Sequence, residues 1–177
     1  MHVTARYSPA AMFLHWTMAV LIITSLAMGQ LFDVIPKEWD DAWLNAHAIL
    51  GTLILLLLLV RIGLRLARPP PDLPADLPEW QKWASHATHA GLYLLMLAVP
   101  TIGLVALFAR GKGIDLGLFA IASPIERARD LARAARGLHA LASNIILVLA
   151  GLHIAAALAH RFFWKDGVLD RMLPGRA

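Results

Sequence analysis

The chain has 177 residues, 59% of them hydrophobic, a formal net charge of +4 at pH 7 and no cysteine. A soluble domain is usually about half apolar, so the composition indicates a membrane protein with lipid, and no nucleic acid, among its partners. The absence of cysteine excludes disulfides, zinc–thiolate sites, iron–sulfur clusters and haem attached covalently through Cys-x-x-Cys-His.

Four runs of the sequence contain no charged residue. They cover residues 8–32, 42–60, 85–109 and 137–160. A membrane-spanning helix needs roughly 20 apolar residues, and each run approaches or exceeds that length. We therefore predict one all-α domain over residues 1–177, an integral membrane four-helix bundle. Its spans are expected at about residues 10–31, 43–64, 85–108 and 138–161.

The first run contains His15 and could be a cleaved signal peptide. It is longer than the 7–15-residue apolar stretch of a signal peptide, and a discarded segment would not need a histidine in its interior. We therefore interpret it as the first span. The second run holds His47, with Gly51 four residues later on the same helical face, and ends just before Arg61 and Arg65.

The third run begins with His86 and His89 and contains Pro100 in its interior. Residues 114–125 are also apolar, but this stretch is too short to cross a bilayer. Together with residues 126–136, which are rich in arginine, it is predicted to form a re-entrant or surface segment between the third and fourth spans.

Lys and Arg residues indicate the orientation of the spans. If the spans alternate, the side with both termini holds nine of the sixteen and the other side seven. The nine are Arg6, Arg61, Arg65, Arg68, Lys82, Arg161, Lys165, Arg171 and Arg176. Because cytoplasmic loops carry an excess of these residues, we expect both termini in the cytoplasm and the protein in the bacterial inner membrane.

The fourth run carries His139 and His153, fourteen residues apart. A helix rises about 1.5 Å and turns about 100° per residue, so the two imidazoles lie on nearly one face, roughly 21 Å apart. The hydrocarbon core of a bilayer is about 30 Å thick. One helix therefore offers two ligands at two depths, which suits two haems between the helices and an electron path across the membrane.

Two further histidines match these depths. His15 lies about seven residues into the first span, and His153 about seven residues before the end of the fourth, so both are near the inner side. His47 and His139 both lie near the outer starts of their spans. We predict that the pairs His15–His153 and His47–His139 each bind one iron. A lone histidine in a span is more often an interhelical hydrogen-bond partner, and His89 competes with His15 for His153.

Several segments resemble the prokaryotic cytochrome b561 family, most closely a superoxide:ubiquinone oxidoreductase within it. They are Leu14-His15-Trp16, Asn45-Ala46-His47 with Gly51, Arg61 and Arg65, residues 85–95 (SHATHAGLYLL), Pro100 with Gly103-Leu104, residues 151–160 (GLHIAAALAH), residues 163–166 (FWKD) and residues 171–174 (RMLP). The resemblance extends over essentially the whole chain, except for residues 115–136.

The resemblance implies four transmembrane helices and two non-covalent b-type haems. It implies His15, His47, His139 and His153 as axial ligands and electron transfer from superoxide to ubiquinone. Two nitrogen ligands leave the iron no open position, so the reactions must take place at haem edges or in pockets beside them. The sequence does not identify a catalytic residue. The basic residues between Arg110 and Arg136 could attract superoxide, because a positive surface concentrates small anions. They could equally bind lipid headgroups.

Six residues near the inner side are candidate contacts for a quinone or a haem. His89, His160, Trp164 and Lys165 lie there and could surround a quinone or a haem. Arg61 and Arg65 could pair with haem propionates through charge-assisted bonds, although they could equally extend to lipid headgroups.

Two other functions remain open from the sequence. A haem b membrane-anchor subunit could relay electrons from a partner dehydrogenase or hydrogenase subunit to quinone, with a similar placement of histidines. A transporter or metal carrier without haem is the third alternative. The spans carry no acidic residue of the kind that commonly helps to bind a cation.

Overall fold

The computed structural model describes residues 6–74 and 77–173, which form a bundle of four long helices. These are α1 (Pro9–Gln30), α2 (Asp40–Ala67), α3 (Glu79–Ala109) and α4 (Arg129–Ala159). Each is built on one of the apolar runs, and all four are long and apolar enough to cross a membrane. The predicted four-helix fold is confirmed. Arg176, counted above for the orientation, lies outside the described residues.

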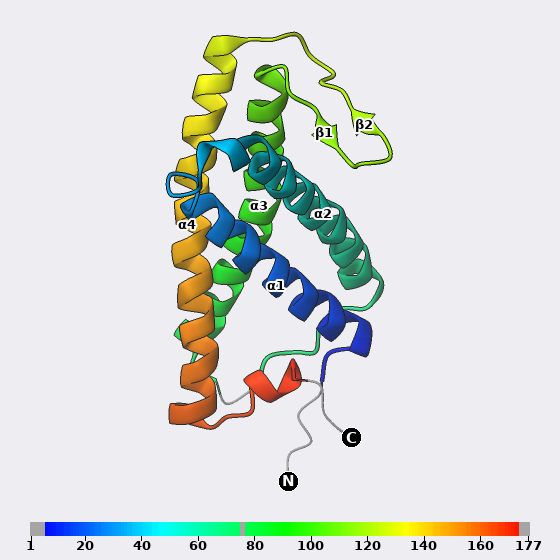
Figure 1. The fold of residues 1–177 in the computed structure, drawn as a ribbon. Coiled ribbons are helices and arrows are strands. Elements are labelled where there is room, and N and C mark those ends of the chain that lie inside the picture. The colour runs from blue at the N-terminus through cyan, green and yellow to red at the C-terminus, as the bar shows by residue number, and fades with distance from the viewer. Residues whose placement is uncertain (1–5, 75–76, 174–177) are drawn as a thin grey trace.

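The helices follow one another around the bundle (Figure 1). α1 packs against α2, α2 against α3 and α3 against α4, whereas the described residues of α1 and α4 make few close contacts. The backbone N–H of Tyr7 donates to the carbonyl of Arg171 at 3.2 Å, so the two terminal segments meet at one end of the bundle. We call this the terminal end and the opposite end, where α3 leads into α4, the hairpin end.

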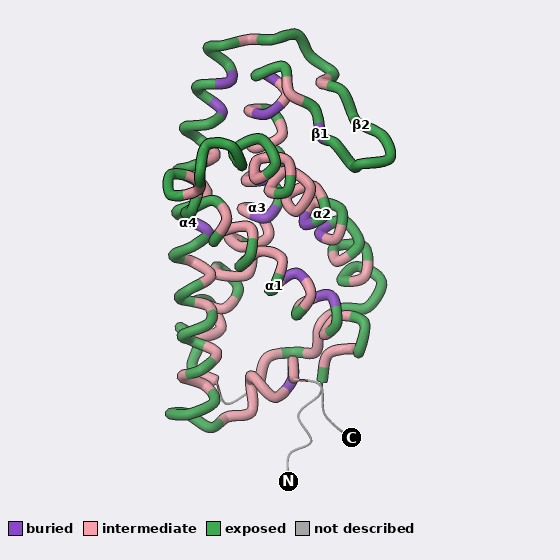
Figure 2. Tube along the Cα trace, in the orientation of Figure 1, coloured by how far each residue is buried: buried purple, intermediate pink, exposed green. Residues whose placement is uncertain are grey.

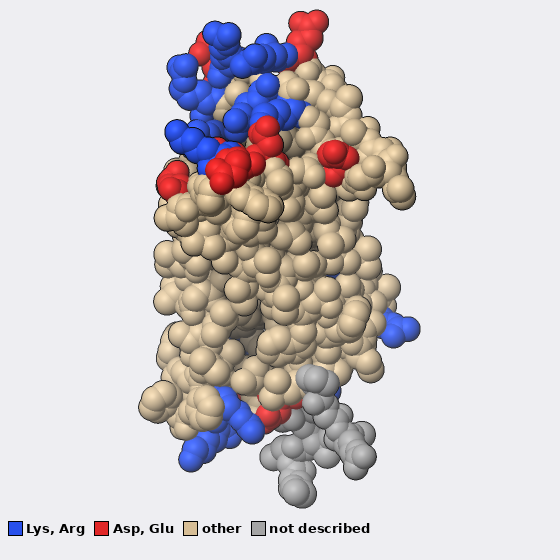
Figure 3. Space-filling model, in the orientation of Figure 1, with Lys and Arg blue, Asp and Glu red and all other residues tan. Residues whose placement is uncertain are grey.

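Burial inside the bundle is limited, as Figure 2 shows. A small core forms where all four helices meet and consists of Met18, Ile54, Leu58, Met96 and Ile146. Many other large apolar side chains face outward. On the face drawn in Figure 3, most Lys, Arg, Asp and Glu side chains gather toward the two ends, and a band of other residues separates them. This distribution is expected of a bundle whose sides contact lipid, because the hydrocarbon solvates apolar side chains as well as a protein core does.

For residues 114–136 the sequence predicted a re-entrant or surface segment, and the structure shows a strand hairpin followed by the start of α4. Strand β1 (Ile114–Asp115) pairs antiparallel with β2 (Ala120–Ile121), with Ile114 opposite Ile121. The basic stretch that follows is largely exposed. Residues 129–136 of this stretch form the first two turns of α4, and residues 126–128 precede the helix. Two glycines permit the hairpin: a Cβ at Gly113 would lie 2.3 Å from the carbonyl oxygen of Ile121, and Gly117 has a φ of +81°.

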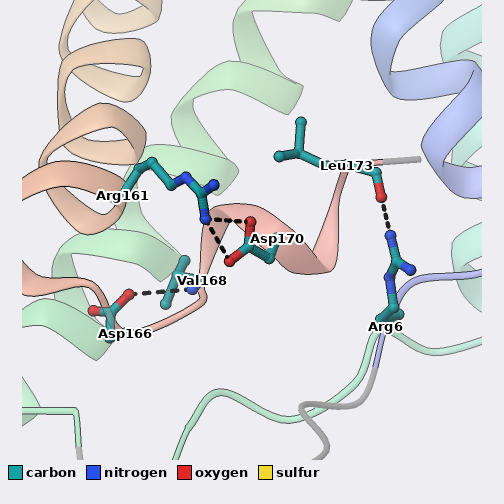
Figure 4. Close-up of polar contacts among 6 residues, drawn as sticks. All are labelled: Arg6, Arg161, Asp166, Val168, Asp170 and Leu173. Carbon is teal, nitrogen blue, oxygen red and sulfur yellow. Dashed lines mark hydrogen bonds and ion pairs between the residues drawn. The ribbon is translucent and has the colours of Figure 1, made fainter. Parts of the chain in front are cut away.

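Residues after α4 fold back across the terminal end. A π-helical turn, η2 (His160–Trp164), and a short 3-10 helix, η3 (Leu169–Arg171), form this segment. Arg161 donates two hydrogen bonds to the carboxylate of Asp170, at 2.8 and 2.9 Å (Figure 4). Arg6 donates to the carbonyl of Leu173.

Arg171 holds the same segment against the connection between α2 and α3. Its side chain is buried and donates to the carbonyls of Pro71 and Asp72, at 2.9 and 2.7 Å. The indole N–H of Trp16 on α1 donates to the carbonyl of Met172 at 2.8 Å. The segment thus closes the terminal end beneath the inner histidines.

Candidate functional site

Two histidines meet at the hairpin end, one from α2 and one from α4. The ring centroids of His47 and His139 are 6.0 Å apart, and the rings are nearly perpendicular at 88°. His47 also makes an edge contact with Phe32, at 5.7 Å between centroids, and its Nδ1 lies 3.5 Å from the hydroxyl of Ser25. The structure therefore brings together the outer pair that the sequence predicted.

The backbone of α3 fixes the orientation of His139. Its Nδ1 lies 2.9 Å from the carbonyl oxygen of Val99. A carbonyl only accepts, so Nδ1 carries the proton, and the lone pair of the neutral ring is on Nε2, where a metal could bind. Gly103 follows Val99 by one helical turn and makes this approach possible. A Cβ there would lie 2.9 Å from Cε1 of His139.

A cavity of about 610 Å³ opens around this pair. Its inner walls include His47, His139, Gly51, Pro100 and Gly103. This volume is in the range of cofactor and ligand pockets, roughly 300–1,000 Å³. Charged side chains from the bundle end also line it, and they are of both signs: Asp33, Asp40, Asp41, Arg110, Lys112 and Arg136.

Three histidines meet at the terminal end, where the sequence predicted a pair and a competitor. The ring centroids of His15 and His153 are 6.3 Å apart, and those of His89 and His153 are 5.5 Å apart. Nδ1 of His89 also lies 3.5 Å from the hydroxyl of Ser85. Both candidate partners of His153 therefore lie beside it.

Arg61 completes this cluster. Its Nη2 lies 3.4 Å from Nδ1 of His15, and its Nε donates to the hydroxyl of Tyr93 at 3.0 Å. Its Nη1 is buried and has no hydrogen-bond partner among the described residues. Arg65 lies over the ring of Tyr93, 5.5 Å from its centroid. A buried donor without an acceptor is costly, so this nitrogen points to an acceptor supplied by another molecule.

The distances between the rings fit a metal held between two imidazoles. Two imidazoles on opposite sides of one metal ion, with metal–nitrogen bonds of about 2.0 Å, have ring centroids about 6 Å apart. The His47–His139 and His15–His153 distances of 6.0 and 6.3 Å agree with this spacing. The 5.5 Å between His89 and His153 is shorter. The cavity beside His47 and His139 provides space for a flat cofactor.

The remaining predicted residues form a group of their own at the end of α4. Nδ1 of His160 lies 2.5 Å from a carboxylate oxygen of Asp166, and its ring centroid is 4.6 Å from that of Trp164. Lys165 is exposed and has a left-handed backbone, with φ of 53°. His89 is not part of this group. It lies beside His153, which precedes His160 by about two helical turns, or roughly 10 Å.

Sequence reasoning missed the residues that orient the histidines. Tyr93, Gly103 and Asp166 all fall inside the segments that carry the family resemblance, but their spacing along the chain assigns them no partner. Each acts on a histidine or arginine from another helix or turn, so its role follows from packing. A signal for Gly103 existed in principle, since glycine is helix-destabilising and this one lies within an apolar helix, near Pro100.

Comparisons with known proteins identify the family. The family model described as prokaryotic cytochrome b561 matches residues 6–175. A probable superoxide oxidase CybB from Yersinia pestis is 34% identical over 172 residues, which covers 96% of both chains. Cytochrome b561 homolog 2 of Escherichia coli (strain K12) is 31% identical, over 95% of this chain and 91% of that protein. A cytochrome b562 from Cereibacter sphaeroides is 30% identical, over 96% of both chains.

Proposed function

Because the chain belongs to the prokaryotic cytochrome b561 family, it is a haem b protein of membrane electron transport, and we propose that it oxidises superoxide and reduces ubiquinone. In this proposal the hairpin end faces the periplasm and receives electrons, and the terminal end faces the cytoplasm and delivers them. The similarity to a probable superoxide oxidase supports the choice of electron donor.

The observation that carries the proposal is the pairing of histidines at both ends of α4. His139 meets His47 at one end, and His153 meets His15 at the other. We propose that each pair binds one non-covalent haem b, with His47 and His139 as the outer ligands and His15 and His153 as the inner ones. Haem b supplies a reversible one-electron iron couple, and two at different depths would connect the two faces of the membrane.

Superoxide is an anion, and the hairpin end has the residues to attract it. Arg110, Lys112 and Arg136 line the cavity beside His47 and His139. Cations beside a site raise the local concentration of a small anion and its encounter rate. Asp33, Asp40 and Asp41 line the same cavity, and Asp41 pairs with Lys112, so the attraction depends on which cations lie nearest the histidines and not on a net positive charge.

The overall reaction requires protons at the side where ubiquinone binds. Two superoxide ions and one ubiquinone, with two protons, give two molecules of oxygen and one ubiquinol. We propose that ubiquinone binds near His160, Trp164 and Lys165 at the terminal end. The pair of His160 with Asp166 offers a proton donor there, and the indole of Trp164 offers an apolar wall.

Haem stoichiometry tests the two-site proposal. We expect two haems per polypeptide in the purified protein, and one in each of the variants His47→Ala and His153→Ala. His86→Ala serves as the matched control, because this histidine is exposed on α3, and it should keep both haems. A single haem in the unmodified protein would contradict the proposal.

Reduction kinetics test the electron donor. Superoxide generated in the solution should reduce the haems. The rate should fall as ionic strength rises, because salt screens the attraction of Arg110, Lys112 and Arg136 for the anion. Alternatively, the protein is a membrane-anchor subunit that relays electrons from a partner subunit to quinone. Copurification with a soluble redox subunit, together with inertness toward superoxide, would favour that role.

A further inference from the structure

The tip of the β1–β2 hairpin is unusually apolar for a loop that protrudes from a protein. Leu118 is 97% exposed and Phe119 62% exposed, and Leu116 and Ile121 are 40% and 44% exposed. A contiguous apolar surface on an exposed loop marks an interaction site. The tip therefore needs a partner with apolar chemistry.

Two contacts fix the hairpin at a defined depth beside α2. The side-chain amide of Asn45 donates to the carbonyl of Asp115 at 2.8 Å and accepts from its backbone N–H, also at 2.8 Å. Lys112 pairs with Asp41 at the start of α2. Asn45 lies inside the second apolar run, two residues after Trp43. Trp residues mark the membrane–water interface, so the base of the hairpin lies at the level of that interface.

The hairpin is directed away from the rest of the bundle at this level. In Figure 1 it lies outside α2, on the side opposite α4. A tip that extends outward at the depth of the interface meets the lipid headgroups and the adjoining part of the acyl chains.

The backbone of the tip is suited to such an environment. Entry into a region poor in water is costly for unpaired backbone groups. The N–H of Leu116 donates to the carbonyl of Phe119 at 2.9 Å, and that of Gly117 donates to the carboxylate of Asp115 at 2.8 Å. Together with the β1–β2 pairing, these bonds satisfy much of the hairpin internally while its side chains stay exposed.

We propose that the β1–β2 hairpin is a membrane-inserting wedge, whose Leu118 and Phe119 side chains lie in the lipid leaflet at the hairpin end. Its partner is the bilayer itself, at the boundary between headgroups and acyl chains, where amphipathic elements insert by about 5–10 Å. The wedge attaches the connection between α3 and α4 to this surface. Through Asn45 it also holds the start of α2, two residues before His47.

Site-directed labelling can test the wedge, since the chain has no cysteine of its own. The variant Leu118→Cys carries a fluorophore on the full-length protein, reconstituted in phosphatidylcholine vesicles. Lipids with a nitroxide near the headgroup should quench it strongly, and iodide in the buffer should quench it weakly. Arg133→Cys is the control, because this side chain is 83% exposed on the first turns of α4. It should show the opposite pattern.

Each other outcome overturns the proposal. Equal quenching by iodide at positions 118 and 133 would place the tip in water. Protection of position 118 from both iodide and the lipid nitroxides would show that protein covers the tip, either a second copy of this chain or another subunit. If Leu118→Cys does not fold, Phe119→Cys gives the same measurement, since it lies at the same tip.

Discussion

The two ends of the bundle hold their histidines by different means. At the hairpin end, a backbone carbonyl fixes His139 with its Nε2 free, and a cavity of about 610 Å³ surrounds the pair. At the terminal end, the nearest polar partner of His15 is the guanidinium of Arg61, which donates to Nδ1. A hollow of about 30 Å³ lies beside Arg61 and Tyr93, and His15, His89 and His153 do not line it.

This difference has a chemical consequence for the tautomers. Nδ1 of His15 faces a donor, so the proton of the neutral ring is on Nε2, the nitrogen that would bind iron. Ligation through Nε2 therefore requires Arg61 to turn from His15 to another acceptor, and a haem propionate is one of suitable chemistry. At the hairpin end a backbone carbonyl thus positions the histidine, and at the terminal end a charged side chain does so. The first should be sensitive to added volume and the second to changes of charge.

The largest effect should come from added volume at the hairpin end. Gly103→Ala places a Cβ 2.9 Å from Cε1 of His139, and the ring cannot retreat without losing the carbonyl of Val99. We expect this variant to lose the outer haem, so that the haem content falls from two to one per chain, as measured by pyridine haemochrome absorbance.

Gly91→Ala is the matched control on the same helix. Its Cβ would lie 3.0 Å from Cδ2 of Leu149, the flexible end of a side chain that can shift. This variant should keep both haems. If Gly103→Ala keeps both as well, the backbone of α3 does not set the geometry of the outer site.

The second-largest effect should distinguish the two ends, because only the reaction proposed for the terminal end consumes protons. Ubiquinone reduction consumes protons, whereas electron donation by superoxide does not. Replacing His160 with Asn keeps a hydrogen-bonding side chain near Asp166 but removes the proton donor. General acids contribute about 100-fold or more, so ubiquinone reduction should slow by on the order of 100-fold. The rate of haem reduction by superoxide, followed by stopped-flow absorbance, should stay the same. An equal loss in both rates would remove His160 from the quinone site.

The sequence predicted the helices and the histidine pairs better than it predicted what surrounds them. Apolar runs near 20 residues leave few alternatives to a spanning helix, and the fourteen residues between His139 and His153 determine two depths. The contact of His139 with Val99 depends on how α3 and α4 pack, which the sequence does not show. The same holds for Arg61 with Tyr93, which lie on α2 and α3. The hairpin was missed because residues 114–125 have no strand alternation strong enough to distinguish a hairpin from a surface segment.

A change of charge should affect only the terminal end. Arg61 is a partly buried cation, and a nearby positive charge favours the reduced state of a haem, so it raises the midpoint potential. Such an interaction is on the order of 2 kcal/mol at an effective dielectric constant of about 20, or roughly 90 mV for one electron. Arg61→Gln should therefore lower the potential of the inner haem by that order and leave the outer one unchanged.

Potentiometric titration monitored by absorbance measures both potentials in one experiment. Arg65→Gln is the control, because its side chain is exposed and water screens its charge, so its effect should be smaller. A shift of the outer potential by Arg61→Gln, with the inner one unchanged, would reverse the assignment of the two ends.

The smallest effect should come from the hydroxyl that holds Arg61 in place. Tyr93→Phe removes the acceptor of the 3.0 Å bond from Nε of Arg61 but keeps the aromatic ring under Arg65. The loss should be about 1 kcal/mol of unfolding free energy, or roughly 2–4 °C in Tm for a chain of this size, measured by thermal unfolding in detergent. The same substitution in an Arg61→Gln background should have little effect on Tm, because the bond is already absent. Equal losses in both backgrounds would mean that Tyr93 stabilises the bundle independently of Arg61. Tyr93 would then not be the residue that holds the Arg61 side chain in place at the terminal end.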